Sequence, residues 1–176
     1  LPSAAAGEYD DMLVTLTAAS KTFNLAGLQN SLVIIPDETI RARFDDYLKK
    51  IRITPSNPMG YIAVEAAYRG GAAWAAECRR QIFENYCLLR DALQKRAPKA
   101  VVSPLEGTYL MWVDLGAYMK AGEMADFMEK RCGLAVDYGE WFGGERFGTF
   151  IRLNLATSHE LAQAAAEKLC AALEQC

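Results

Sequence analysis

The chain has 176 residues, of which 52% are hydrophobic and 23% charged, and its 19 basic and 22 acidic residues give a net charge of −3. This composition is typical of a folded chain with a sizeable core and excludes a disordered one. The absence of a basic excess argues against nucleic acid as a partner, and no apolar run is long enough to span a bilayer. We therefore expect one domain, or one domain and part of another.

The cysteines are scattered along the chain, and none forms a C-x-x-C pair. His159 is the single histidine, so the sequence predicts no bound metal. An odd number of scattered cysteines favours free thiols in a reducing cytoplasm over a disulfide framework. We therefore expect a cytoplasmic protein whose thiols are free: Cys78, Cys87, Cys132, Cys170 and Cys176.

The first predicted elements are two short strands and a helix. Met12–Leu16 is apolar and leads into the small-residue turn Ala18–Lys21, and Leu32–Ile35 is rich in β-branched residues. Asp37 then suits a helix N-cap. Apolar residues follow it at helical spacing, so we expect one face of this helix to pack on a core: Ile40, Phe44, Tyr47, Leu48 and Ile51.

Proline and glycine mark two segments as loops, namely Ile53–Gly60 and Gly139–Gly148. Between them, a long helix is predicted from about Ala73 to Arg96, where Pro98 stops it. A second helix, Glu123–Cys132, is expected to end at Gly133, because glycine is the usual residue just past a helix. The predicted strands of this part are Val101–Val102, Thr108–Leu115, Leu134–Tyr138 and Thr149–Ala156.

The last predicted strand alternates between two faces. Ile151, Leu153 and Leu155 share one face, which leaves Arg152 in mid-strand on the other. Thr157 and Glu160 then predict a capping box for a final helix. The buried stripe of that helix is expected to consist of Leu161, Ala165, Leu169 and Leu173.

The order of these elements predicts an α/β protein in which a mixed sheet is covered by helices. An initial strand–loop–strand–helix section leads through the long helix into a compact α+β unit, which extends from about Ala97 to the C-terminus.

Lys21 is the first candidate for chemistry. The small residues before it would let a bulky ligand approach the backbone, and nearby hydroxyls could bind a phosphate. A lysine held beside Phe23 and Leu25 could act as a nucleophile or a base. The alternative is a solvated surface lysine, which is the common case.

Five stretches of the sequence support the chemical interpretation of Lys21. Residues 20–28 read S-K-T-F-N-L-A-G-L, and four others follow in order: Asn57-Pro58-Met59-Gly60, Ala66-Ala67-Tyr68 with Trp74, Gly107-Thr108-Tyr109-Leu110-Met111-Trp112-Val113-Asp114, and Phe150-Ile151-Arg152-Leu153-Asn154. The first stretch resembles the Schiff-base segment of the class I/II aminotransferase superfamily, the fold type I enzymes that use pyridoxal 5′-phosphate. Together the five resemble its cystathionine β-lyase-like branch of C–S β-lyases, over nearly the whole chain.

The resemblance implies a role for several residues. Lys21 would carry the cofactor as a Schiff base and serve as the acid/base at the substrate Cα, and Arg152 would bind the substrate α-carboxylate. A guanidinium on a polar strand face suits bidentate carboxylate binding. Further candidates are Ser20 and Thr17 for the cofactor phosphate, Tyr109 and Tyr138 for the substrate entrance, and Asn57 for the active site of a neighbouring subunit.

Each of these assignments has a structural alternative. Arg152 could pair with one of the chain's own carboxylates. The hydroxyls of Ser20 and Thr17 could bond local backbone, and Asn57 could form a turn. The two tyrosines could simply be buried aromatic residues.

The resemblance also implies how the chain relates to a whole enzyme. It would be the C-terminal portion, with residues 1–58 in the large cofactor-binding domain, 59–96 in interdomain helices and 97–176 in a small α+β domain. The full-length protein, expected to be a homodimer, would catalyse β-elimination from sulfur amino acids to thiol, pyruvate and ammonia. One alternative is an aminotransferase that uses the same lysine and arginine. The other is an inactive structural or dimerisation fragment.

Overall fold

The computed structural model describes residues 8–53 and 57–176. The chain forms two compact units, Leu1–Ala75 and Ala76–Cys176, which we call the N-terminal and C-terminal units. Helices and strands in both units confirm the α/β class, but every strand pairing among the described residues is antiparallel rather than mixed. No helix in the described part of the chain is both long and apolar enough to cross a membrane.

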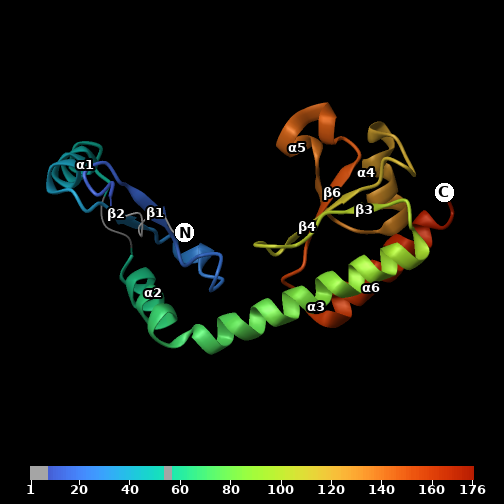
Figure 1. The fold of residues 1–176 in the computed structure, drawn as a ribbon, viewed down its shortest axis with the longest axis horizontal. Coiled ribbons are helices and arrows are strands. Elements are labelled where there is room, and N and C mark those ends of the chain that lie inside the picture. The colour runs from blue at the N-terminus through green and yellow to red at the C-terminus, as the bar shows by residue number, and fades with distance from the viewer. Residues whose placement is uncertain (1–7, 54–56) are drawn as a thin grey trace. The chain divides into compact units, whose positions relative to one another are not determined.

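The N-terminal unit is built on a pair of short antiparallel strands, in which Leu16 lies opposite Val33. The turn with Lys21 and a 3-10 helix connect the two strands, and two helices follow (Figure 1). The elements are β1 (Thr15–Thr17), η2 (Ala26–Leu28), β2 (Leu32–Ile34), α1 (Glu38–Lys50) and α2 (Pro58–Gly70).

Helix α1 begins where the sequence predicts but does not pack as predicted. The Asp37 Oδ1 accepts a hydrogen bond from the backbone N–H of Ile40 at 2.7 Å, so Asp37 is the N-cap. The expected packing of the apolar face is wrong, because α1 has no buried residue and Tyr47 is 60% exposed. Helical spacing groups apolar residues on one face, but it does not provide the surface that covers them. The buried hydrophobic residues described in this unit are Ala19, Ile35 and Val64.

The predicted loop Ile53–Gly60 ends earlier than expected, because Pro58 to Gly60 already belong to α2. Asn57 is the N-cap, and Pro58 takes the first helical position, where a missing N–H costs nothing. Residues 54–56 of the predicted loop lie outside the described residues.

The C-terminal unit contains a four-stranded sheet with the strand order β3-β4-β6-β5. The long helix α3 (Ala72–Arg96), predicted almost to the residue, starts in the N-terminal unit and runs into this one. The remaining elements are β3 (Val101–Val102), β4 (Leu110–Asp114), η3 (Ala121–Glu123), α4 (Met124–Asp126), η4 (Phe127–Cys132), β5 (Asp137–Tyr138), α5 (Glu140–Gly143), η5 (Gly144–Phe147), β6 (Phe150–Asn154) and α6 (His159–Leu173).

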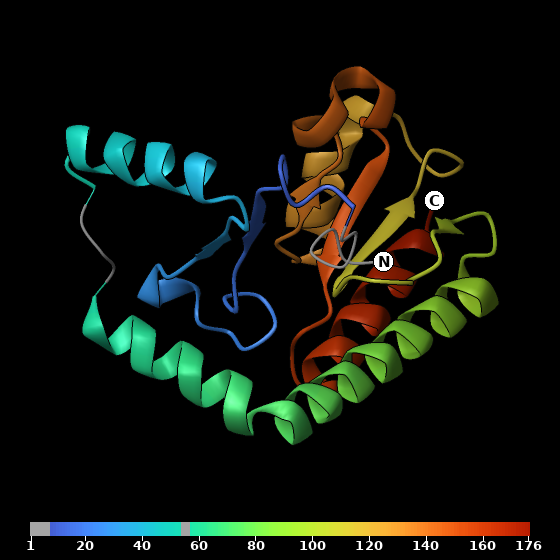
Figure 2. The same cartoon turned by 60° about the vertical axis from the view of Figure 1, so that its left-hand side comes forward.

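One face of this sheet forms the core of the unit. Ile151 and Leu153 are buried on it as predicted, next to Met111 and Val113 of β4. Figures 1 and 2 show α3 and α6 side by side along the sheet, and both helices contribute buried residues to the same core as α4 and η4. These include Leu89, Leu93, Phe127, Met128, Leu169 and Leu173. Arg152 is therefore left on the opposite face.

Two expectations for the C-terminal unit are wrong. The glycine-rich segment Gly139–Gly148 is not a loop but folds into the short helices α5 and η5, because its aromatic side chains pack on the outer face of the sheet. The cap of α6 is Ser158 rather than Thr157, and its Oγ accepts from the Leu161 N–H at 3.3 Å. Leu161 is consequently 63% exposed, and the buried stripe consists of Ala162, Ala166, Leu169, Cys170, Ala172 and Leu173.

Candidate functional site

Lys21 lies in a tight turn that follows β1 in the N-terminal unit. Within this turn the backbone N–H of Phe23 donates to the Ala19 carbonyl at 3.0 Å, and that of Leu25 donates to the Ser20 carbonyl at 2.9 Å. Ala19 is buried, whereas Lys21 is exposed. The turn thus places the Lys21 amine where a ligand can reach it.

The aromatic ring of Phe23 fixes this turn to the helices of its unit. It meets Tyr68 edge-on at 5.9 Å between ring centroids and stacks on Trp74 at 6.1 Å. Gly71 permits this approach, since a Cβ at that position would lie 2.5 Å from Cε1 of Phe23. The lysine is therefore presented by a turn that is anchored through packing.

The polar groups around Lys21 fit the cofactor that the family resemblance implies. Among the described residues, neither the Lys21 ammonium nor the hydroxyl of Ser20 or Thr17 has a hydrogen-bond or ion-pair partner. A free amine close in sequence to two free hydroxyls is a donor set that suits a ligand bearing both an aldehyde and a phosphate.

The side chain of Asn57 is occupied in holding the start of α2. Its Oδ1 accepts from the backbone N–H of Gly60 at 2.8 Å, and its Nδ2 donates to the Leu28 carbonyl at 2.9 Å. Both polar ends of the amide are used, so this geometry favours the structural interpretation of Asn57 as a turn and cap residue.

Arg152 lies at the centre of the outer face of the C-terminal sheet. In register it is flanked by Trp112 on β4 and Asp137 on β5. Its Nε and Nη2 both donate to Oδ2 of Asp137, at 3.0 and 2.7 Å, so the predicted alternative of an internal ion pair is present. The ring of Phe142 lies over the guanidinium, with its centroid 4.1 Å from Cζ.

An aromatic layer surrounds this arginine. Trp112 stacks on Phe150 at 5.4 Å and meets Phe142 and Phe147 edge-on at 5.9 Å. Tyr138 of β5 lies opposite Ile151 and packs against the core, on the other face of the sheet from Arg152, and its hydroxyl donates to Oε1 of Glu129 at 3.0 Å. Burial, together with this hydrogen bond, raises the pKa of Tyr138 to about 12.

The remaining predicted site residue, Tyr109, is half-buried just before β4, and its backbone carbonyl accepts from the Leu155 N–H at 2.9 Å. Sequence reasoning missed Asp137 and Phe142. Asp137 had a weak signal, since it lies in a predicted strand, but local sequence does not reveal which strands are neighbours. Phe142 had none, because it lies in a segment that the glycines marked as a loop.

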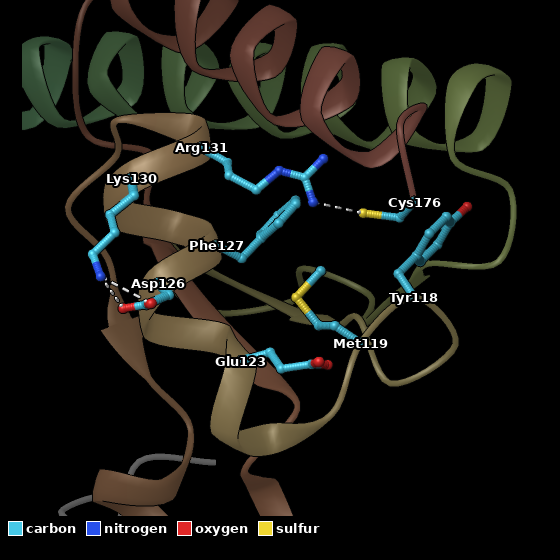
Figure 3. A pocket seen from close by; sticks show the side chains of 8 residues that line it. All are labelled: Tyr118, Met119, Glu123, Asp126, Phe127, Lys130, Arg131 and Cys176. Carbon is cyan, nitrogen blue, oxygen red and sulfur yellow. Dashed lines mark hydrogen bonds and ion pairs between the residues drawn. The ribbon is translucent and has the colours of Figure 1, made fainter.

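A separate cavity of about 450 Å³ lies in the C-terminal unit, lined by residues around α4 and η4 and by Cys176 (Figure 3). Lys130 pairs with Asp126 at its edge, and Arg131 Nη1 donates to the Cys176 Sγ at 3.7 Å. None of the predicted site residues lines this cavity, so size alone does not make it the candidate active site. The lining residues are Tyr118, Met119, Glu123, Asp126, Phe127, Lys130, Arg131 and Cys176.

Comparison with known proteins identifies relatives of both units. The chain is 34% identical over 167 residues to cystathionine beta-lyase PatB of Bacillus subtilis, which covers 94% of this chain and 43% of that protein. Its structure is similar to that of cystalysin from Treponema denticola, which contains pyridoxal 5′-phosphate, with a TM-score of 0.88 and 33% identity over 96% of this chain and 43% of that one. The PLP-bound C-S lyase from Staphylococcus hominis gives a TM-score of 0.80 at 32% identity, over 96% of this chain and 44% of that chain.

The chain thus spans less than half the length of these relatives. The sequence model of the family described as aminotransferase class I and II matches residues 3–169, nearly the whole chain. The order of the motifs, the Lys21 turn and this match agree, and the chain belongs to the class I and II aminotransferase family.

Proposed function

We propose that the protein containing this chain is a pyridoxal 5′-phosphate-dependent C–S β-lyase of the cystathionine β-lyase type. The observation that carries the proposal is the Lys21 turn, whose exposed amine has no partner in the described part of the chain, in a chain 34% identical to a cystathionine beta-lyase over 94% of its length. The similarity to the PLP-bound C-S lyase structure supports the same reaction class, and the similarity to cystalysin, which contains pyridoxal 5′-phosphate, supports the cofactor.

Four residues of this chain would bind the cofactor and the substrate. Lys21 would hold the cofactor through its amine, and Ser20 and Thr17 would donate hydrogen bonds to the cofactor phosphate. Once bound, the cofactor would supply an electron sink for charge at the substrate Cα. Lys21 would also act as the base that takes the proton from Cα. Arg152 would bind the α-carboxylate and so orient the Cα–H bond, a kind of positioning that can lower a barrier by several kcal/mol.

The reaction balances without an oxidant or a reductant. The Cα–H and Cβ–S bonds break, the sulfur leaves as a thiolate that is protonated, and water completes the conversion to pyruvate and ammonia. For cystathionine, the thiol product is homocysteine. In this reaction the residues of the chain would handle the proton and the carboxylate of a small amino-acid substrate.

The family membership keeps an aminotransferase as the second candidate, because the same lysine and arginine would serve there. The two reactions differ in their need for a keto-acid acceptor. We would incubate the protein that contains this chain with cystathionine and measure pyruvate. Pyruvate without any acceptor is expected for the lyase, whereas strict dependence on an acceptor would replace this proposal by transamination.

Lys21 is tested separately, through the visible absorbance of the amine-bound cofactor. Lys21→Ala should abolish this absorbance, and Lys49→Ala, which changes another exposed lysine of the same unit, should retain it. Absorbance that survives Lys21→Ala would overturn the assignment. The 176-residue chain alone serves as a third sample, and a lack of absorbance there would assign it a structural or dimerisation role as isolated.

We also propose a domain organisation, an oligomeric state and a location for the protein that contains this chain. Residues 1–58 would belong to a large cofactor-binding domain, 59–96 to connecting helices and 97–176 to a small domain. A homodimer is supported by the many exposed apolar side chains of the N-terminal unit, among them Leu16, Met59 and Ile62. A cytoplasmic location is supported by the five free cysteines.

A further inference from the structure

The guanidinium of Arg152 is restrained from two directions by its own chain. Along one edge, Nε and Nη2 share a single acceptor, Oδ2 of Asp137, at 3.0 and 2.7 Å. Over one face lies the ring of Phe142, whose centroid is 4.1 Å from Cζ. The arginine side chain is 29% exposed, so this arrangement is half-buried and not a fully solvated surface pair.

The pairing of β5 with β6 explains why Asp137 contacts Arg152. Asp137 and Arg152 lie directly opposite each other in the pairing of β5 with β6, and Trp112 lies opposite Arg152 on the other side. Directly opposite residues have Cβ atoms about 5 Å apart, which suits contact between an aspartate and the inner part of an arginine side chain. The ion pair is therefore set by strand register and not by chance contact of mobile side chains.

These restraints leave one part of the guanidinium open. Among the residues that the structure describes, Nη1 has no hydrogen-bond partner. A carboxylate pairs best with arginine through two parallel N–H···O bonds. Since Asp137 covers the edge formed by Nε and Nη2, the edge formed by Nη1 and Nη2 is the one that a second carboxylate can approach.

The geometry points to Asp137 as a positioning residue that holds Arg152 ready to bind the α-carboxylate through its Nη1–Nη2 edge. This inference rests on the proposed role of Arg152. Its physical basis is that arginine carries much rotamer freedom, and binding is weakened when that freedom must be lost as the substrate arrives. Asp137 and Phe142 remove it beforehand.

The kinetic test uses the protein that contains this chain, with cystathionine as substrate. Asp137→Ala should raise KM about tenfold, as expected for loss of a hydrogen bond to a charged group, and leave kcat within about twofold. Asp137→Asn keeps an oxygen that accepts from Nε and Nη2, so its KM should lie closer to the wild-type value. An unchanged KM in both variants would overturn the inference, because Asp137 would then not help Arg152 to bind the substrate. A lowered KM in both variants would also overturn it, because it would mean that Asp137 only repels the substrate.

A second readout needs no activity. Phenylglyoxal modifies arginines, and mass spectrometry reports the rate at each site. Asp137→Ala should speed modification of Arg152 severalfold and leave that of Arg96, which pairs with Glu167 and Glu174, unchanged. Equal modification rates at Arg152 in the wild-type protein and Asp137→Ala would contradict the restraint by Asp137. A changed rate at Arg96 would reveal a folding defect in Asp137→Ala, and the rate at Arg152 would then be measured in Asp137→Asn instead.

Arg152→Gln tests the proposed role of Arg152 separately from the positioning role of Asp137. If this variant leaves KM unchanged, the proposed role of Arg152 itself fails. If Arg152→Gln raises KM and Asp137→Ala does not, the role of Arg152 stands and only the positioning role of Asp137 is lost.

Discussion

Asn85 is a fully buried polar residue of α3, and its side chain ties the helix to the chain segment between β6 and α6. Its Nδ2 donates to the carbonyls of Leu155 and Thr157, both at 3.0 Å, and its Oδ1 lies 3.1 Å from Nδ1 of His159. Asn85→Ala leaves these carbonyls short of donors inside the unit. We expect the free energy of unfolding to fall by about 2 kcal/mol, measured by urea denaturation.

Gln81 offers a matched control, because its Nε2 also donates to the Thr157 carbonyl, at 2.8 Å, from a half-buried position on the same helix. Water can replace its hydrogen bond, so Gln81→Ala should lower the stability by clearly less than Asn85→Ala. Equal losses in the two variants would mean that burial of the amide does not matter.

The candidate site shows how far single residues can be interpreted from sequence. Strand alternation placed Arg152 on the face away from the core, and it also allowed an ion pair with one of the chain's own carboxylates; both features are present. Which carboxylate it would be depended on the pairing of β5 with β6, a contact between separate segments. Local periodicity carries no information about strand neighbours, so Asp137 could not be identified beforehand.

Among the elements, the helical segment from Ala121 to Cys132 ends at a residue in the left-handed conformation. Gly133 follows with φ 60°, in the left-handed region, as the sequence predicted for a C′ residue. A Cβ there would meet only the Lys168 Nζ, at 4.0 Å, so the effect of substitution is conformational. Gly133→Ala should destabilise the unit by about 1 kcal/mol in urea denaturation.

Gly122→Ala is the control for this element, since Gly122 has no atom within 4 Å of an added Cβ and no positive φ. That variant should be neutral or slightly stabilising because alanine restricts the unfolded chain. Gly133→Asn should lose less than Gly133→Ala, because asparagine tolerates the left-handed region better. A neutral Gly133→Ala would show that this end of the helix is not held in the left-handed conformation.

The ends of helices were predicted correctly where a single capping residue or proline determined them. Asp37 caps α1, and α3 ends at Arg96 before Pro98, both as predicted. The cap of α6 was one residue off, because Thr157 and Ser158 are both good N-caps and only the fold chooses between them. The helices α5 and η5 were missed since packing of Phe142 and Phe147 on Trp112 overrides the glycine-rich composition.

At the scale of the whole molecule, the two units differ in what they bury. The C-terminal unit has a continuous core drawn from its sheet and four helical segments. The N-terminal unit buries little, although the periodicity of α1 is that of a core-facing helix. Sequence thus predicted which faces are apolar in both units, but the presence of a covering surface is a property of tertiary structure that periodicity does not contain.

The exposed apolar side chains of the N-terminal unit predict that the chain self-associates. Leu16 is 73% exposed on β1 and Ile62 is 61% exposed on α2, and many other large apolar side chains of this unit are exposed as well. Exposed apolar surface of this kind promotes association. Light scattering should therefore show a mean mass of the 176-residue chain that rises with concentration.

Burying one such side chain contributes about 2 kcal/mol, so Leu16→Ser or Ile62→Ser should weaken association by about tenfold or more. Leu161→Ser removes an equally exposed leucine from the C-terminal unit, at 63%, and should leave association unchanged. A monodisperse monomer at high concentration would contradict the expectation, and equal effects of all three substitutions would mean that association does not depend on the N-terminal unit.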